Sequence, residues 1–511
     1  MRRAAFVVSL LLLAAPARAQ EEEVIDDPML RPTPTPTPTP TPGPIPTPTP
    51  TRAPPPAPQL WRLSVLSRGA MQTSWDDLPG GGKDVVEWRT RAILSAGDSP
   101  TRRLKWEVGA RIDVLARAQR RGEPATTFEA RPWEAYLDVA PWDRLRIKVG
   151  NQILSWGRLD VGSAADVLGA YDLREGPAID IDALRIPTPT ATVTWFPIDA
   201  AQLDIGYTPF FTPHRFDVAG TNYALVGPNA PAAVASAFQK LRGQLDPSSY
   251  AAITSDFARV NSPDARPDNG ELGARGTWRT GPFDLAVTYG FVRSKLPSIA
   301  LAPELVALLA SANGTTDLTA AGQVAAKIQN GEHLVTTSYD RYHQVALDME
   351  GTAGPFTLAG EVGFSPQRTL YVRDPDTALP NAVRSAVLQT GLKATYAREE
   401  TFAISAEASV ITASEGAGGA TYFVLGPHRR LGIAFLAVHD ELGHHVLDAA
   451  ALATTSGPSV SLVPRYGYKL TDAFIAGAGA AFFGGPRGDD GSLATAQRGL
   501  DQLFVYVDLR L

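Results

Sequence analysis

Residues 104–114 read LKWEVGARIDV and alternate between two kinds of side chain. Every second residue from Leu104 to Val114 is apolar, and four of the five residues between them are charged. A period of two predicts a β-strand with one apolar and one polar face. The alternation outlasts the about 5 to 6 residues of an ordinary strand and fits the roughly 9 to 11 residues of a tilted transmembrane strand.

Three later runs repeat this alternation and add an aromatic residue at each end. Their apolar faces are Phe283, Leu285, Val287, Tyr289 and Phe291; Phe356, Leu358, Gly360, Val362 and Phe364; and Phe474, Ala476, Ala478, Ala480 and Phe482. At about 3.4 Å per residue and a tilt near 40°, the paired aromatics lie roughly 20 Å apart in depth. This spacing predicts an apolar belt between two aromatic girdles.

The whole region from residue 60 to residue 511 divides into strands of this kind. We expect eighteen strands, beginning near residues 60, 84, 103, 129, 144, 188, 200, 271, 282, 339, 355, 384, 400, 429, 443, 458, 473 and 500. Short and long connections alternate, so that all short ones share one rim, as in bacterial outer-membrane barrels. The predicted fold is therefore all-β, a transmembrane antiparallel up-and-down β-barrel. Helical segments at 231–245 and 303–328 are expected in long extracellular loops, as caps or plugs.

The N-terminus has the three parts of a secretion signal. Arg2 and Arg3 form a positive region, residues 4–15 are apolar, and Ala17-Arg18-Ala19 is a small-residue cleavage site, so the mature chain is expected to start at Gln20. A membrane anchor is the alternative, but a helical span needs about 20 apolar residues. Removing residues 1–19 takes away three arginines and changes the formal charge from −6 to −9. Such a mildly acidic chain is not expected to bind nucleic acid.

Residues 20–59 are predicted to be a disordered periplasmic segment, acidic at first and then rich in Pro and Thr. Proline fixes φ and lacks an amide donor, which favours extended polyproline II. The segment is either a spacer or a docking site for a cell-wall or periplasmic partner. The chain has no cysteine, which excludes disulfides, thiolate metal sites, a cysteine nucleophile and a lipoprotein anchor.

The C-terminal residues 502–511 alternate like a barrel strand. They resemble the terminal strand that bacterial barrel-assembly machinery recognises, which makes that machinery and outer-membrane lipid the expected partners. Such strands usually end in phenylalanine, whereas this chain ends in Leu511.

Residues 149–157, VGNQILSWG, contain a G-x-Q-x-x-x-W-G pattern, and Asp160, Asp166 and Asp172 follow it. This pattern resembles a signature of a largely uncharacterised family of porin-like outer-membrane proteins of Gram-negative bacteria, distantly similar to alginate-export and other substrate-selective porins. Residues 464–468, 471–472 and 477–484 also resemble the closing strands of that family. The resemblance implies a channel and names no substrate.

The inward face of the strands and the loop after them supply candidate pore-lining residues. Gln152 and Trp156 are expected on the face of Arg146 and Lys148, just before the chain enters a loop at Arg158. Charged residues of both signs in that loop predict a constriction if it folds inward, or an ordinary solvated loop if it does not. The candidates are Arg89, Arg91, Lys105, Glu107, Arg111, Asp113, Arg146, Lys148, Gln152, Trp156, Arg158, Asp160, Asp166, Asp172 and Arg174, with Glu134, Asp138, Glu175, Asp180, Asp182 and Arg185 beside them. Both signs are present, so anion or cation selectivity stays open.

Catalysis is the less favoured reading, and no cofactor, metal site or catalytic residue is predicted. The segment 440–444, DELGH, has aspartate where a zinc protease has its first histidine, and it is expected to be a hairpin turn. His343 and His445 have no distinctive serine partner, and no G-x-S-x-G motif is present. The predicted function is passive diffusion of small solutes through a porin. A non-conducting barrel that binds a partner or ligand is the first alternative, and an outer-membrane hydrolase is the second.

Overall fold

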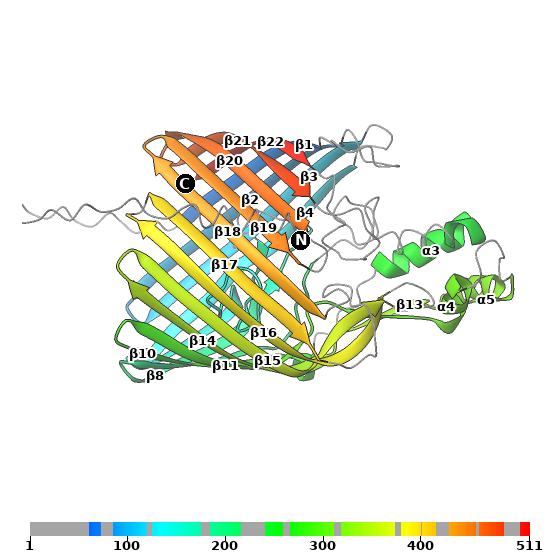
Figure 1. The fold of residues 1–511 in the computed structure, drawn as a ribbon, viewed down its shortest axis with the longest axis horizontal. Coiled ribbons are helices and arrows are strands. Elements are labelled where there is room, and N and C mark those ends of the chain that lie inside the picture. The colour runs from blue at the N-terminus through cyan, green and yellow to red at the C-terminus, as the bar shows by residue number, and fades with distance from the viewer. Residues whose placement is uncertain are drawn as a thin grey trace, which may run out of the picture. The chain divides into compact units, whose positions relative to one another are not determined.

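The computed structural model describes residues 61–72, 85–119, 125–174, 184–215, 241–258, 266–310, 318–373, 380–399, 401–414, 429–455, 459–484 and 501–511. Within them, eighteen antiparallel strands form one closed sheet (Figure 1). The predicted fold class and strand number are confirmed. The expected signal peptide and the Pro/Thr-rich segment lie outside the described residues.

The barrel strands follow one another around the wall in chain order. They are β1 (Trp61–Gln72), β2 (Val85–Thr101), β3 (Leu104–Gln119), β4 (Ala125–Trp142), β5 (Leu145–Gln152), β8 (Thr188–Ile198), β9 (Ala201–Thr208), β10 (Glu271–Thr280), β11 (Phe283–Arg293), β14 (Arg341–Ala353), β15 (Phe356–Arg373), β16 (Pro380–Arg398), β17 (Phe402–Ala413), β18 (Arg430–Leu442), β19 (His445–Thr454), β20 (Ser459–Thr471), β21 (Phe474–Gly484) and β22 (Gln502–Arg510). Two small hairpins lie outside the wall sheet: β6 (Ala170–Tyr171) with β7 (Arg185–Ile186), and β12 (Ser298–Leu301) with β13 (Val335–Ser338).

Most strands begin within two residues of the expected position, but β4 and β16 begin four residues early. Each early segment extends a hairpin at the rim with the long connections, where Ala125 pairs with Arg117 and Pro380 pairs with Arg373. Pairing with a long neighbour thus prolongs a strand whose own sequence carries a weak signal.

The first and last strands close the barrel. Val65 of β1 lies opposite Leu509 of β22, and Leu63 and Leu511 exchange backbone hydrogen bonds of 2.8 Å. Trp61 and Leu511 therefore lie at the same rim as the tight turns, such as the one between Thr280 and Phe283. The long connections lie at the opposite rim. We call these two ends the short-turn side and the long-loop side.

The outer face of the wall is apolar. On β11, Leu285, Val287 and Tyr289 are exposed, whereas the inward Ala286 and Thr288 are buried. Large aromatic side chains are exposed near the short turns, and a second exposed set lies towards the long-loop side. The first set is Trp61, Trp142, Trp195, Trp278, Phe283 and Phe356, and the second is Trp88, Phe128, Tyr207, Phe364 and Phe482. An outer surface of this kind is suited to hydrocarbon rather than to water.

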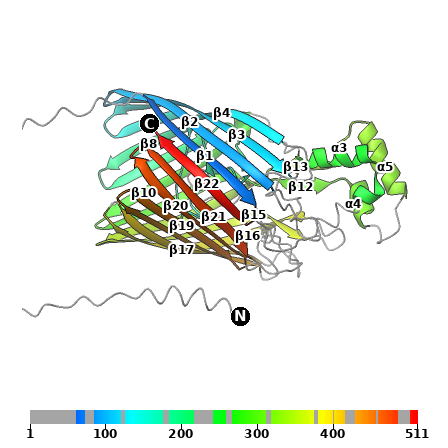
Figure 2. The same ribbon diagram turned by 90° about the horizontal axis from the view of Figure 1, so that it is seen from above.

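Helices occur in the long connections, beyond the long-loop side of the wall (Figure 2). They are α3 (Pro247–Ala258), α4 (Pro303–Ala310) and α5 (Leu318–Gln329), and a 3₁₀ turn, η2, covers Pro267–Asn269. Leu241, Ile253, Leu305, Leu308 and Val324 are buried in a core that these helices share with β13. None of the helices in the described ranges has both the length and the hydropathy needed to span a membrane.

The helices α3, α4 and α5 form a lobe, and the helices expected from the sequence match it in part. The segment 303–328 contains two helices, α4 and α5, and residues 311–317 between them lie outside the described part. Of the segment 231–245, residues 241–244 are helical and 231–240 lie outside the described part. Helix α3 was not predicted.

Candidate pore and inward loop

The loop after β5 lies against the inner wall of the barrel. We call residues 153–174 the inward loop. Strand β5 ends at Gln152, so the chain leaves the wall six residues earlier than the expected entry at Arg158. Gly150 has a φ of 135°, which favours glycine, and an added Cβ there would clash with the backbone of Ala135 and Tyr136. The early exit places the loop within the barrel rather than above its rim.

Two wall glutamates hold the turn of the inward loop. Glu361 of β15 is 5% exposed, and its carboxylate accepts hydrogen bonds from the amides of Arg158 and, at 3.0 Å, Leu159. Its other oxygen accepts the Ser163 hydroxyl and the Ala164 amide, both at 2.8 Å. Several amide donors on one buried carboxylate compensate for the water that it has lost.

Glu407 of β17 repeats this arrangement two strands further along. Its carboxylate accepts the amides of Asp160 at 2.7 Å and Val161 at 3.0 Å. Gln389 of β16 donates to the carbonyl of Gly162. We call Glu361 and Glu407 the glutamate anchor, because together they satisfy the backbone donors of an irregular segment in the interior of the barrel.

A row of glycines on the wall makes room for the apolar side chains of the inward loop. A Cβ on Gly273 would lie 2.5 Å from Trp156, and one on Gly363 would lie 2.5 Å from the Cβ of Ala164. The glycine row is Gly206, Gly273, Gly290, Gly363 and Gly391, one residue on each of β9, β10, β11, β15 and β16. Gly206, Gly273 and Gly290 are directly opposite one another across neighbouring strands. Trp156 is therefore buried on the wall beyond the end of β5, and it does not extend the strand face of Arg146 as expected.

Ion pairs add to the contact between the inward loop and the wall. Nε of Arg158 lies 3.2 Å from Oδ1 of Asp348, whose carboxylate also forms two bonds of 2.7 Å with Arg275. Asp160 lies 2.7 Å from Nζ of Lys393. Because Asp348 is buried, its two guanidinium partners are needed to compensate for its desolvation.

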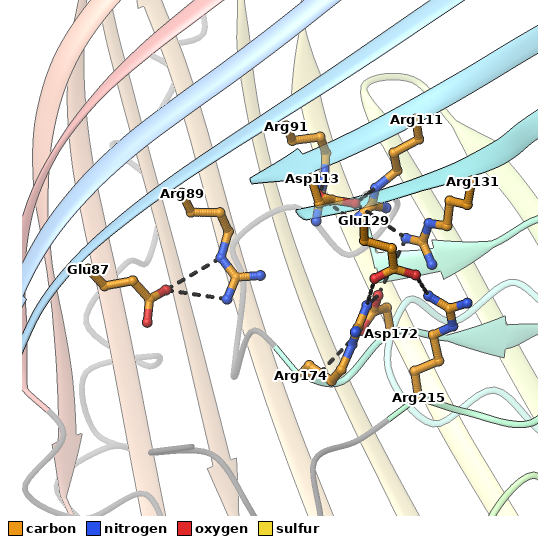
Figure 3. A network of polar contacts seen from close by, with 10 residues as sticks. All are labelled: Glu87, Arg89, Arg91, Arg111, Asp113, Glu129, Arg131, Asp172, Arg174 and Arg215. Carbon is orange, nitrogen blue, oxygen red and sulfur yellow. Dashed lines mark hydrogen bonds and ion pairs between the residues drawn. The ribbon is translucent and has the colours of Figure 1, made fainter. Parts of the chain in front are cut away.

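The opposite part of the wall, β2 to β4, carries a cluster of arginines (Figure 3). Asp113 lies 3.0 Å from Arg91 and 2.6 Å from Arg111. Glu87 contacts Arg89 at 3.3 Å and Arg117 at 3.0 Å. Several of the predicted lumen residues thus lie together on one part of the inner wall.

Acidic residues of the inward loop and β4 contact this cluster. Asp172 is 1% exposed and contacts Arg174 at 2.7 Å and Arg131 at 3.4 Å, while Glu129 contacts Arg174 at 2.9 Å and also Arg215. Despite desolvation, which acts to raise it, these arginines hold the pKa of Asp172 well below its ordinary value. The hydrogen bond from Arg174 to Asp172 raises the pKa of that guanidinium. Both groups therefore remain charged at physiological pH.

Other contacts fix the end of the inward loop. Asp166 accepts hydrogen bonds from the Tyr171 hydroxyl at 2.6 Å and from Arg185 at 2.8 Å. The Tyr171 amide donates to Nδ1 of His214 at 3.1 Å. Desolvation of the His214 ring, with nearby Lys295 and Arg368, lowers its pKa to about 3. A neutral ring is the form that can accept this hydrogen bond.

A cavity of about 510 Å³ lies between the start of the inward loop and the wall on the short-turn side. Gln152, Trp156 and Arg158 line it, together with residues of β3 to β5 and β8 to β11. Its charged lining residues are the six cations Lys105, Arg146, Lys148, Arg158, Arg275 and Arg279 and the three anions Asp138, Asp204 and Asp284. It is a polar chamber with charges of both signs, and two of its cations, Arg158 and Arg275, are paired with the buried Asp348 behind the lining.

Other predicted residues form contacts in or beside this chamber. Glu107 accepts the Tyr136 hydroxyl at 2.8 Å, and Nζ of Lys105 lies 3.8 Å away from it. Arg146 contacts Asp138 at 2.6 Å. Gln152 donates to the Thr190 carbonyl at 2.8 Å, so this buried amide supports the wall. Glu175, Asp180 and Asp182 lie outside the described residues.

The sequence analysis missed the glutamate anchor and the glycine row. Glu361 is 203 residues from Arg158, and a single sequence does not say that the two meet. A partial signal exists, since Glu361 and Glu407 are charged residues in the middle of strands. A buried charge needs partners, and either a neighbouring strand or a loop from elsewhere in the chain can supply them.

The histidines weighed for catalysis lie near aromatic residues. Nδ1 of His343 is 2.8 Å from the Tyr289 hydroxyl, and Nδ1 of His445 is 2.6 Å from the Tyr466 hydroxyl. The segment 440–444 runs from the end of β18 into its tight turn with β19, where Gly443 has a φ of 60°. The part of the chain that the structure describes contains no cluster of three or more His, Asp or Glu side chains placed to hold a metal ion.

The chain is also similar to several solved structures, at low sequence identity and with TM-scores below 0.5. Salmonella typhi OmpF, solved in complex with daunomycin, is 11% identical, with 88% of this chain and 97% of that chain covered and a TM-score of 0.42. Pseudomonas aeruginosa OccK5 (OpdH) is 10% identical over 88% of this chain and 98% of that chain, with a TM-score of 0.42. Acinetobacter baumannii OccAB4 is 8% identical over 88% and 97%, with a TM-score of 0.42.

A search among curated proteins found none that matches the sequence. A family model does match, and it covers residues 115–466, which extend from the end of β3 to β20 and include the inward loop, the glutamate anchor and the glycine row. The chain belongs to the family described as "Protein of unknown function (DUF1302)".

Proposed function

We propose that the protein is an outer-membrane channel through which small solutes diffuse passively. The observation that carries the proposal is a closed barrel with an apolar outer face and a charged inner wall. An apolar exterior between aromatic girdles fits a lipid bilayer, and a charged interior needs water. Barrels of 16 to 18 strands are wide enough to hold an aqueous passage.

The inward loop supports a size limit for the solute. It spans the inner wall from β5 to β17, and the glutamate anchor holds it there. A segment fixed inside a barrel narrows the passage, and the charges on both sides of it act on whatever crosses. The proposed substrates are therefore small, hydrated solutes.

The expected topology places the short-turn side in the periplasm, following the usual asymmetry of these barrels. Trp61 lies at that rim. We therefore propose that residues 20–59, which precede it, are in the periplasm after removal of the signal peptide. The lobe formed by α3, α4 and α5 would then face outwards.

Liposome swelling with neutral sugars of increasing size tests the proposal. Vesicles that contain the full, folded protein should swell with small sugars and stop swelling above a size limit. Vesicles with heat-denatured protein provide the control. If folded protein never lets any sugar through, the proposed channel function is wrong.

The helical lobe favours a second candidate function, which is the binding of a partner or surface ligand. Its buried core, with Leu305 and Leu308 fully covered, is a folded unit that a bare channel does not need. Deleting residues 21–58 separates the candidates in part. Permeation and partner binding should both be unchanged if that segment is a spacer. Loss of partner binding with unchanged permeation would favour the binding function.

A further inference from the structure

Among the described residues, the inner wall opposite the glutamate anchor holds more guanidinium groups than carboxylates. The arginine cluster consists of Arg89, Arg91, Arg111, Arg117, Arg131, Arg174 and Arg215, and the described acidic residues in contact with it are Glu87, Asp113, Glu129 and Asp172. Arg131 and Arg111 also lie directly opposite each other across β3 and β4. Like charges in that register repel, so the arrangement favours additional negative charge.

Arg131 retains unused hydrogen-bond donors in this place. Its side chain is 8% exposed, and only Nη2 reaches carboxylates, Asp172 at 3.4 Å and Asp113 at 3.9 Å. Within the described part of the chain, its Nε and Nη1 atoms are buried without a hydrogen-bond partner, as is Nε of Arg117. Leaving such donors unpaired costs free energy, which a bound acceptor would recover.

An aromatic ring and the inward loop hold these guanidinium groups in place. Arg111 and Arg131 lie 5.1 Å and 5.9 Å from the centre of the Trp133 ring, which is itself buried. In Figure 3 the side chains of Arg91, Arg111 and Arg131 converge from three neighbouring strands towards Asp113. Guanidinium groups that are already positioned lose little entropy when an oxyanion binds.

We propose that Arg131 and its neighbours form a binding site for an oxyanion, the carboxylate or phosphate group of a small solute, and that the channel therefore prefers anions. This inference rests on the proposed channel function and names its substrate class. Guanidinium groups bind carboxylate and phosphate oxygens through charge-assisted hydrogen bonds.

Calorimetric titration of the full protein in detergent tests the site without any need for conductance. Inorganic phosphate and acetate are titrated separately, which distinguishes the two oxyanions. At least one probe should bind the unchanged protein, and Arg131→Gln should weaken that binding about tenfold, because a charged donor is lost. Arg103→Gln, an exposed arginine of a short turn, is the matched control and should bind like the unchanged protein.

Lack of binding by both probes, or equal binding to the unchanged protein and Arg131→Gln, would overturn the inference. If Arg131→Gln does not fold, Asp172→Asn supplies the test. Loss of its competing carboxylate should tighten probe binding, and weaker or unchanged binding would contradict the site.

The reversal potential of bilayers under a KCl gradient then tests the solute class. The unchanged channel should favour chloride over potassium, and Arg131→Gln should lower that ratio about twofold, since one fixed charge of several is removed. A channel that favours potassium contradicts the anion preference alone. A protein that binds phosphate but never conducts leaves the site in place and contradicts the channel function.

Discussion

Buried charged side chains are paired differently in the two halves of the inner wall. On β15 and β17, Glu361 and Glu407 are saturated by amides of the inward loop, and the glycine row lets that loop lie flat on the wall. On β2 to β4, the described arginines outnumber the described acidic residues that contact them, and two buried donors of Arg131 have no partner among those residues. The comparison assigns the two halves different roles. The first half holds the inward loop in place, and the second is the half that we propose binds an oxyanion.

The glutamate anchor should give the largest effect when it is broken. In Glu361→Gln, buried amides of the inward loop lose a charged acceptor, and hydrogen bonds to a charged group contribute about 1.5 to 3 kcal/mol each. We expect the inward loop to detach, single-channel conductance to rise and trypsin to cleave after Arg158. Glu350→Gln is the control, since Glu350 is partly exposed and its only ion pair among the described residues is with the Arg158 side chain, at 3.3 Å. Equal conductance and equal cleavage in the two variants would show that Glu361 is not the anchor.

The glycine row should give a moderate effect. In Gly273→Ala the new methyl would lie 2.5 Å from Trp156, and overpacking of this kind costs about 1 to 3 kcal/mol. The midpoint of urea unfolding, followed by tryptophan fluorescence, should fall. Gly276→Ala on the same strand meets no atom within 4 Å and serves as the control. A Gly273→Ala midpoint at or above that of the control would mean that the loop does not press on this row.

The end of the inward loop should depend on pH through His214. Its folded-state pKa of about 3 lies below the ordinary 6.5, so protonation favours the unfolded state as the pH falls. The stabilising effect is therefore complete above about pH 6.5 and is lost progressively towards pH 3. Tryptic cleavage at Arg174 should speed up between pH 6.5 and pH 5 in the unchanged protein. His214→Asn, which does not titrate, should show a flatter profile, and identical profiles would remove His214 from this role.

A substitution at the short-turn rim should have the smallest effect on stability and conductance. Arg103 and Asp143 form an exposed ion pair at 3.2 Å in short turns at the rim. Exposed pairs contribute about 0 to 1 kcal/mol. Arg103→Gln should leave both the unfolding midpoint and the conductance unchanged within error. A large change in conductance would mean that the rim, rather than the inner wall, controls passage.

The barrel could be predicted because its strands carry their signal locally. The alternation at Leu104 to Val114 and the aromatic pairs such as Phe356 and Phe364 fix which face meets the outside. Helix α3 had a local signal that was overlooked. Asp246 caps its amides at Ser248 and Ser249 at 2.9 and 3.0 Å, and Pro247 occupies the first turn, as is usual for proline.

The contacts of the inward loop could not be predicted in the same way. The sequence left open whether the aspartate-rich loop turns inward, because that depends on Glu361 and Glu407, about two hundred residues away. The glycine row depends on register across strands, which aligns Gly206, Gly273 and Gly290 only in the folded sheet. The prediction that Trp156 continues the strand was wrong, because β5 ends at Gln152, although Trp156 does line the chamber together with Arg146 and Lys148.

Single-channel recording of the full, folded protein beside Glu361→Gln tests the central claim most directly, namely that an anchored loop narrows a conducting passage. We predict discrete conductance steps for the unchanged protein and larger, noisier steps for the variant. Absence of steps in the unchanged protein, or steps of the same size in both proteins, would contradict it.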